Sequence, residues 1–296
     1  MTADGPRDGF AGAGGVRLHY LDWGGEGEPV VLLPGLGQSA HIFRDLAPAL
    51  ADGARVIALT PRAHGASDAP GGGYTVAALA DDLGAFLDAL GIAAAALVAH
   101  SFSGTVATRF AADHPARVTR LAYLDALTDL AAVGRVQFRN PVRPPPMPHD
   151  DAAAERDWLG RYSYGAWTDA IEADFRARPA GDEAVRRHDL HAHLLDDAAE
   201  ATPPYARVRS PMLALVAGES VETQYGWLAA DDDGRRALAR DYLDHVRGPW
   251  RRGAVERFRR EAPHARVVTI PGHHFLFVSS RDAVVSELRA FLLPSP

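Results

Sequence analysis

A serine occupies the sharpest predicted turn of this sequence. Residues 96–110, ALVAHSFSGTVATRF, begin as a buried strand and continue as a helix, with Ser101 between them. Small residues surround it, with Ala99 two positions before and Ser103 and Gly104 shortly after. A hydroxyl at a strand–turn–helix junction is typical of a nucleophile elbow, whose neighbours must be small because other backbone lies close to the turn. The alternative is that Ser101 only caps the following helix.

Two backbone amides are predicted to face this hydroxyl. The amide of Phe102 lies at the start of the helix, where the helix dipole favours negative charge. A glycine turn directly follows the strand in VVLLPGLGQSAHIF, and it offers the amide of Leu36 as a second donor. Together they would form an oxyanion hole for the tetrahedral intermediate of an acyl transfer.

Short apolar runs alternate with helical patterns, and these elements must position the serine. Most of the runs are continuously hydrophobic, which is typical of strands buried on both faces of a parallel sheet. Residues 74–91 and 281–292 place their apolar side chains on one helical face. The alternation predicts an α/β fold with a mostly parallel central sheet flanked by helices. The predicted strands are 16–23, 30–34, 55–60, 95–100, 120–126, 211–218 and 266–272.

The stretch from 127 to 205 contains no convincing strand. It opens with the connector RNPVRPPPMPHD and continues as polar helical segments that carry Trp158 and Trp167. A stretch of this length inside a sheet domain predicts an inserted helical cap. We therefore predict a core of residues 1–126 and 206–296 and a cap of residues 127–205. The two tryptophans are either core residues or the wall of an apolar substrate pocket.

Composition excludes several kinds of chemistry and partner. The 296 residues carry a net charge of -7, contain no cysteine, and draw all 31 basic residues from arginine. The acidic balance gives no reason to expect nucleic acid, and without cysteine or lysine there are no thiolate nucleophiles or Schiff bases. No apolar run approaches the roughly 20 residues of a membrane span, and residues 1–15 do not resemble a signal peptide. We expect a cytoplasmic protein with no membrane contact and no cofactor.

From about residue 10 to residue 293 the chain resembles the lidded branch of the α/β-hydrolase superfamily. Residues 34–35 are similar to the family's His-Gly oxyanion turn, with proline in place of histidine. Residues 62–67, RAHGAS, are similar to its Arg-Gly-x-Gly-x-Ser loop, and the insertion after YLDA stands where the family carries its cap. The resemblance implies a nucleophile, an acid and a histidine in that chain order.

The resemblance also places the base and the acid. It assigns His274 as the base, rather than the histidine before it, because HHFLFVSS then leads into the final helix. The family's usual acid position holds Val221, which cannot serve. Asp125, at the end of the YLDA strand, is the favoured acid because some members use that location, and Glu222 stays the alternative. The acid would hold the imidazole in the correct tautomer.

These features predict a cofactor-free serine hydrolase that cleaves an ester, lactone or thioester bond of an apolar small molecule. Two alternatives stay open: a carbon–carbon bond hydrolase on the same triad, and a non-hydrolytic small-molecule binding protein on the same fold. Epoxide and haloalkane hydrolysis are disfavoured because related enzymes place Asp at the elbow. The charged segment 230–263 predicts a solvated helix pair or a subunit contact, so a homodimer is one option.

Two further motifs have plainer explanations. Residues 35–40, GLGQSA, match a dinucleotide fingerprint and Arg62 could imitate a 2′-phosphate partner, but a proline intervenes before the first glycine. His188, His191 and His193 suggest a metal site. The third of these points away from the other two on a helix, so a solvated lid helix is the simpler interpretation, and no metal is predicted.

Overall fold

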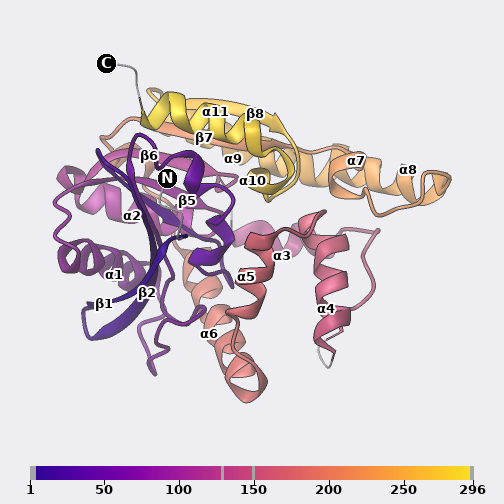
Figure 1. Cartoon of the computed structure of the whole chain (residues 1–296). Helices are drawn as coiled ribbons and strands as arrows, with labels where there is room; N and C mark the ends of the chain where they lie inside the picture. Colours follow the sequence, from indigo (N-terminus) through magenta and orange to yellow (C-terminus); the bar gives the residue numbers. More distant parts are fainter. Residues whose placement is uncertain (1–4, 128–129, 149–150, 294–296) are drawn as a thin grey trace.

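The computed structural model describes residues 5–127, 130–148 and 151–293. Its strands are β1 (Arg7–Ala13), β2 (Val16–Gly24), β3 (Pro29–Leu33), β4 (Arg55–Leu59), β5 (Ala95–His100), β6 (Val118–Leu124), β7 (Met212–Gly218) and β8 (Arg266–Pro271). They form one sheet in the order β1-β2-β4-β3-β5-β6-β7-β8 (Figure 1). β2 is antiparallel to β1 and β4, and every other pairing is parallel. The predicted α/β fold with a mostly parallel sheet is confirmed.

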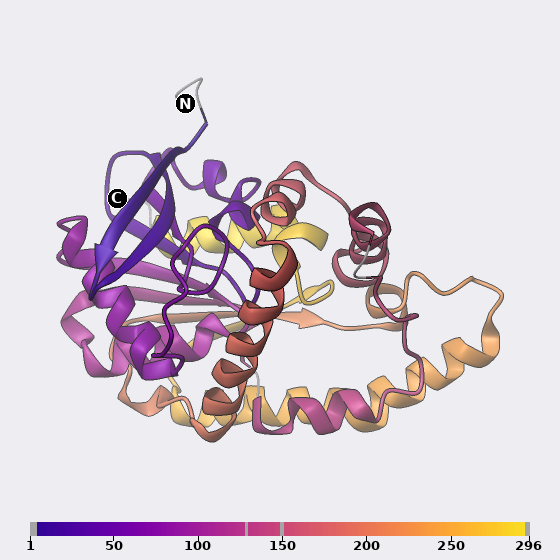
Figure 2. The same cartoon turned by 90° about the horizontal axis from the view of Figure 1, so that it is seen from below.

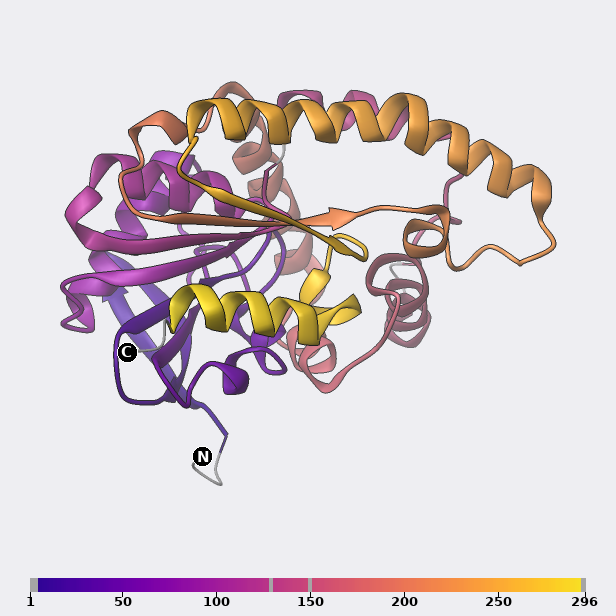
Figure 3. The ribbon, with the colours of Figure 1, turned by 90° about the horizontal axis from the view of Figure 1, so that it is seen from above.

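Helices cover both faces of this sheet. Outside the β6–β7 connection the helices are η1 (Ala40–Phe43), η2 (Ala47–Ala49), α1 (Val76–Ala89), α2 (Ser103–Asp113), η3 (Pro115–Arg117), α7 (Val221–Gln224), α8 (Asp233–Tyr242), η6 (Leu243–Arg247), α9 (Gly248–Glu261), α10 (Leu276–Ser279) and α11 (Arg281–Leu292). α1, α2 and α9 pack on one face, and η1, η2 and α11 pack on the other. α8, η6 and α9 follow one another without a break as one long helix (Figure 3). No helix of the described residues has both the length and the apolar character needed to cross a membrane.

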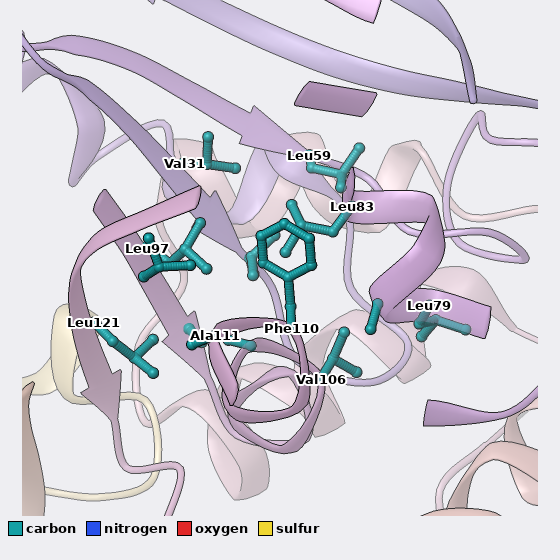
Figure 4. Packing of buried hydrophobic residues seen from close by; sticks show 14 of the residues in the cluster. Val31, Leu59, Leu79, Leu83, Leu97, Val106, Phe110, Ala111 and Leu121 are labelled. Atoms are coloured by element: carbon teal, nitrogen blue, oxygen red, sulfur yellow. The ribbon is translucent and has the colours of Figure 1, made fainter. Parts of the chain in front are cut away.

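The central strands are buried on both faces, which explains their continuous hydrophobic sequences. In β3, Val31 and Leu33 belong to one core, whereas Val30 and Leu32 belong to the other. Phe110 of α2 lies in the middle of the first core, between the strands and the leucines of α1 (Figure 4). Successive side chains of a strand point to opposite faces, so one apolar run serves both cores.

The described part of the β6–β7 connection is helical. It contains α3 (Leu130–Phe138), α4 (Ala152–Leu159), a π-helical turn η4 (Gly160–Tyr164), α5 (Asp169–Arg176) and α6 (Gly181–Glu200). α3 lies along the long helix (Figure 2), where the hydroxyl of Tyr242 donates to the carbonyl of Val136 over 2.9 Å. α5 is held at η1, because Asp174 accepts two 2.7 Å hydrogen bonds from the amide and the hydroxyl of Ser39. The insertion therefore contacts the rest of the chain at two places, through α3 at the long helix and through α5 at η1.

Gly104 marks a close approach between α2 and the end of β6. A Cβ at this position would lie 2.6 Å from the Cβ of Ala126 and 3.0 Å from its carbonyl oxygen. We expect Gly104→Ala to lower the free energy of unfolding by about 1–3 kcal/mol, because overpacking forces the backbone apart. Denaturant titration followed by circular dichroism measures this loss. In the control Gly134→Ala, in α3, the added Cβ meets no atom within 4 Å, and an equal loss in both variants would contradict the packing argument.

Candidate active site

Ser101 lies in a strained turn between β5 and α2. Its backbone φ is +53°, a left-handed value that costs a non-glycine residue about 1–3 kcal/mol unless the surroundings enforce it. The amide of Ser101 donates to the carbonyl of Leu124 over 3.2 Å, and its carbonyl accepts from the amide of Gly104 over 2.9 Å. The Ser101 side chain does not cap the helix, which begins at Ser103 without a side-chain cap. This conformation is the one that a nucleophile elbow requires.

The small residues around the turn have separate physical reasons. A Cβ on Gly35 would lie 3.2 Å from the Cβ of Ser101 and 2.9 Å from the ring of His100, so the loop after β3 lies directly against the elbow. Ser103 stands where the family pattern usually has glycine, and its hydroxyl donates to the carbonyl of Pro34. That hydrogen bond ties the elbow to the loop that carries Leu36.

His274 connects Ser101 to a buried carboxylate. Its Nε2 lies 2.9 Å from Oγ of Ser101, and its Nδ1 lies 2.8 Å from Oδ2 of Asp125. The other oxygen of Asp125 accepts from the amide of Ala217 over 2.9 Å. Although burial acts to raise the pKa of Asp125, the charge of Arg251 and the hydrogen bond from His274 hold it well below the usual range. Asp125 is therefore an ionised, fixed acceptor for the imidazole.

The alternative acid, Glu222, does not contact His274. Its carboxylate is exposed and accepts from Arg236 over 2.9 Å. Glu219, the other acid of this loop, has a buried side chain that accepts from Nε and Nη2 of Arg247, each over 2.7 Å. Of the carboxylates weighed from the sequence, the structure brings Asp125 to His274 and does not bring Glu222 there.

The two predicted oxyanion donors remain available. Among the residues that the structure describes, the amides of Leu36 and Phe102 have no acceptor. Both flank Ser101, one on the adjoining loop and the other at the N-cap position of α2. Unpaired amides beside a nucleophile are what an oxyanion hole needs before substrate arrives.

A second histidine supports the loop that carries His274. His100 is buried, with Nε2 at 3.2 Å from the carbonyl of His274 and Nδ1 at 3.1 Å from Oε1 of Gln38. Burial lowers the pKa of His100 well below its ordinary value, so the ring is neutral. Gln38 also accepts from the amide of Gly35 over 3.1 Å. His100 therefore lies between the loop that carries His274 and the loop that carries Leu36.

Comparison with known proteins agrees with this architecture. The solved structure of E-2-(acetamidomethylene)succinate hydrolase superposes with a TM-score of 0.72 and 20% identity, covering 97% of this chain and 98% of the other. A family model described as alpha/beta hydrolase fold matches residues 28–168. The chain has the α/β-hydrolase fold. The resemblance to the α/β-hydrolase superfamily inferred from the sequence motifs is thereby confirmed, while its lidded serine-hydrolase branch stays a prediction.

Sequence relatives of this α/β-hydrolase carry several names. A soluble epoxide hydrolase from Corynebacterium sp. strain C12 is 37% identical over 120 residues, which are 40% of this chain and only 42% of that relative. A haloalkane dehalogenase from Sphingobium indicum is 26% identical over 313 aligned positions, covering 94% of this chain and 92% of the relative. The stronger match spans less than half of its relative's length, so these names identify the family and leave the reaction open.

A cleft of about 790 Å³ opens beside His274 in this α/β-hydrolase. Its walls come from η4, from the loop after β7 and from the loop after β8, with the aromatic side chains of Tyr162, Tyr164 and Trp227 among them. The ring of Tyr164 packs 4.5 Å from that of Phe275, the residue next to His274. The β6–β7 insertion and His274 therefore line the same cleft.

The two tryptophans chosen from the sequence lie outside the lining of this cleft. The indole of Trp158 donates to the carbonyl of Pro145 over 2.8 Å, and its ring packs on Tyr162. Trp167 donates to Glu172 over 2.9 Å and lines a separate groove beside α4. The indole N–H groups of both tryptophans donate to acceptors outside the cleft. Trp227, which lies outside the predicted cap, lines the cleft instead.

The histidine-rich helix and the loop of residues 62–67 hold one another. Nε2 of His191 lies 3.1 Å from the carbonyl of Ala63, and its ring packs on His64. Arg62 is bound by both oxygens of Asp82 at 2.6 Å, so it is not free for a 2′-phosphate. The fingerprint GLGQSA runs into the four-residue turn η1 and not into the long helix of a dinucleotide site.

One group of side chains within the described residues has the spacing of metal ligands, and it does not include the histidines of α6. Asp8, His19 and His41 place one ligand atom each within 4.8 Å of one another. Nδ1 of His41 accepts from Nε of Arg44 over 3.0 Å, so the proton of this ring is on Nε2. Burial and the charge of Arg44 lower the pKa of His41 to about 4. The protonated Nε2 and the nearby cation both oppose a metal ion here.

Arg251 is the site residue that the sequence did not reveal. It lies in the segment expected to be a solvated helix pair, which is instead a single long helix with an inward face. Its guanidinium contacts Asp125, with 3.2 Å between Nη1 and Oδ2. The available signal was the four-residue spacing of Arg247 and Arg251, because that spacing places both on one side of a helix.

Proposed function

We propose that this α/β-hydrolase is a serine hydrolase that cleaves an ester, lactone or thioester bond through an acyl-enzyme. The observation that carries the proposal is the imidazole of His274, hydrogen-bonded to Ser101 at 2.9 Å and to Asp125 at 2.8 Å. A nucleophile, a base within reach of its proton and an acid that orients the base are the parts that acyl transfer requires.

The proposed steps follow from these contacts. His274 takes the proton of the Ser101 hydroxyl while Oγ attacks the substrate carbonyl carbon. The amides of Leu36 and Phe102 stabilise the oxyanion that forms, and His274 then gives its proton to the departing alcohol or thiol. A water molecule repeats the sequence on the acyl-enzyme, and the carboxylic acid leaves with Ser101 restored. Asp125 keeps the Nδ1 proton in place throughout.

The nucleophile separates this proposal from the activities of the named relatives. Related epoxide and haloalkane hydrolases place Asp at the elbow position, and a carboxylate there is suited to attack an alkyl carbon. Here the elbow residue is Ser101, and an alcohol oxygen activated by an imidazole suits a carbonyl carbon. This difference favours acyl transfer over epoxide or halide displacement.

The substrate is proposed to be a small molecule with an apolar part. The aromatic side chains of Tyr162, Tyr164 and Trp227 line the cleft beside His274 and would bury such a group. Residues 127–205 are proposed to act as the cap, because their turn η4 supplies two of these three side chains. Polar side chains also line the cleft, so polar substituents of the substrate can form hydrogen bonds there.

A fluorophosphonate probe tests the proposal, because only an activated hydroxyl reacts with it. We expect one adduct per chain, located by mass spectrometry on the peptide that contains Ser101. His274→Gln should slow labelling by about 10²-fold or more, since the proton acceptor is lost. Ser286→Ala, an exposed change in α11, should label like the wild type. An unlabelled protein would favour the non-hydrolytic binding protein, and labelling confined to another serine would refute the assignment.

A further inference from the structure

Arg251 closes a buried cluster of charges behind the proposed triad. Its side chain is 14% exposed, and that of Asp125 is 1% exposed. Nη2 of Arg251 contacts Oδ1 of Asp125, Nη1 lies 3.2 Å from Oδ2, and Nη2 also lies 3.4 Å from the carbonyl of Ala217. The planar fork of an arginine therefore covers both oxygens of the carboxylate, a geometry that fixes direction as well as charge.

A second ion pair holds the first in place. Arg247, one helical turn before Arg251, donates to both oxygens of Glu219, and Nη1 of Arg251 lies 3.5 Å from Oε1 of the same carboxylate. Glu219 directly follows β7, while Asp125 directly follows β6. Buried charges are tolerated when they are paired and hydrogen-bonded. Two guanidinium groups and two carboxylates form such a set, which joins helix α9 to the ends of two adjacent strands.

We infer that Arg251 is a positioning residue for the catalytic acid, and that it sets the pH range in which the triad works. The inference rests on the proposed serine hydrolase function. Arg251 and the amide of Ala217 hold Oδ1 of Asp125, while Oδ2 contacts both Arg251 and Nδ1 of His274. Without the guanidinium the carboxylate loses a restraint on its rotation, and the imidazole loses a fixed partner.

The charge of Arg251 has a separate effect from its geometry. It opposes the positive charge on His274 and it favours the ionised form of Asp125. Removing this charge therefore favours the protonated carboxyl of Asp125, which no longer accepts from the imidazole, and this moves the acid limb of the activity profile to higher pH. The other titratable groups facing the pair are His100 and His273, whose pKa values burial lowers, and the ion-paired Glu219.

The test compares two neighbouring arginines of α9. Arg251→Met removes the fork, whereas Arg252→Met changes an exposed side chain that does not contact Asp125. With a p-nitrophenyl ester as substrate, we expect Arg251→Met to lower kcat/KM by about 10²-fold at pH 7 and to raise the acid limb by about one pH unit. Arg252→Met should stay within twofold of the wild type, with an unmoved limb.

A charge-conserving variant separates the two effects. Arg251→Lys keeps the positive charge but loses the bidentate contact. We expect a fall of about tenfold in kcat with the acid limb near its wild-type position. If Arg251→Met does not fold, as judged by circular dichroism, Arg251→Lys decides the question: wild-type kcat in that variant would overturn the positioning role.

The ring of His274 provides a readout that does not depend on catalysis. Its Nδ1–H proton signal in NMR, assigned by comparison with His274→Gln, should weaken or vanish in Arg251→Met, because the proton loses its fixed acceptor. Loss of this signal in a protein that neither labels with fluorophosphonate nor hydrolyses esters would support the positioning inference and contradict the proposed function. A retained signal in an active enzyme, with kcat/KM within threefold of wild type in Arg251→Met, would contradict the positioning inference and leave the proposed function supported.

Discussion

Ser101→Ala is expected to lower kcat for p-nitrophenyl ester hydrolysis by on the order of 10⁴-fold or more, because no other group can form the acyl-enzyme. The hydroxyl is the atom that His274 contacts at 2.9 Å, and its removal deletes one oxygen without adding bulk. Turnover that remains would come from the amides of Leu36 and Phe102 and from substrate binding. Initial rates at saturating substrate, measured on protein purified in parallel with the wild type, give this ratio.

The fold of this variant should be intact. Alanine at position 101 must still adopt the φ of +53° that the turn imposes, so the strain is nearly unchanged. We therefore expect thermal unfolding within a few degrees of the wild type, which excludes unfolding as the cause of the lost rate. Retention of even a tenth of wild-type turnover in the folded variant would mean that Ser101 is not the nucleophile.

Asp125→Asn is the second variant with a large expected effect, on the order of 10³–10⁴-fold in kcat/KM. An amide in place of the carboxylate no longer requires the Nδ1–H tautomer of His274, and its NH₂ group meets either the imidazole or Arg251 as a second donor. The matched change Glu222→Gln alters a carboxylate that lines the cleft but does not contact His274, so it should leave kcat within about twofold. Measurement of kcat and KM in both variants decides between Asp125 and Glu222, the two acids named from the sequence. A large loss in Glu222→Gln together with a mild one in Asp125→Asn would reverse the assignment.

We expect the stability difference between the wild type and Asp125→Asn to depend on pH. The pKa of Asp125 in the folded chain is lowered from 3.8, so its ionised form stabilises the fold above that value, and this contribution disappears as pH falls toward the folded-state pKa. The difference in melting temperature between the wild type and Asp125→Asn should accordingly be largest near neutral pH and shrink below about pH 4. A difference that does not vary with pH would show that ionisation of Asp125 contributes nothing to stability.

The alternation of strands and helices and the position of the turn at Ser101 could both be predicted from the amino-acid sequence. Seven strands have their own apolar runs, and a strand buried on both faces can be recognised without knowing its neighbours. β1 was not predicted, because its sequence RDGFAGA has no β-branched residue. It forms a strand through its antiparallel pairing with β2, which the residues of β1 alone do not indicate. Gly104 helps to reveal the turn, because a Cβ at this position would lie 2.6 Å from the Cβ of Ala126 and the position therefore tolerates no larger side chain.

The tertiary structure decided which carboxylate meets His274, which aromatic side chains line the cleft, and that Arg251 reaches Asp125. Residues 125 and 251 lie on different elements far apart in the chain, and only the adjacency of β6, β7 and α9 brings them together. Trp158 and Trp227 look alike in sequence, yet one donates to a nearby carbonyl and the other lines the cleft. Local sequence records what a backbone position tolerates, whereas an ion pair or a pocket wall depends on the packing of segments that no local pattern describes.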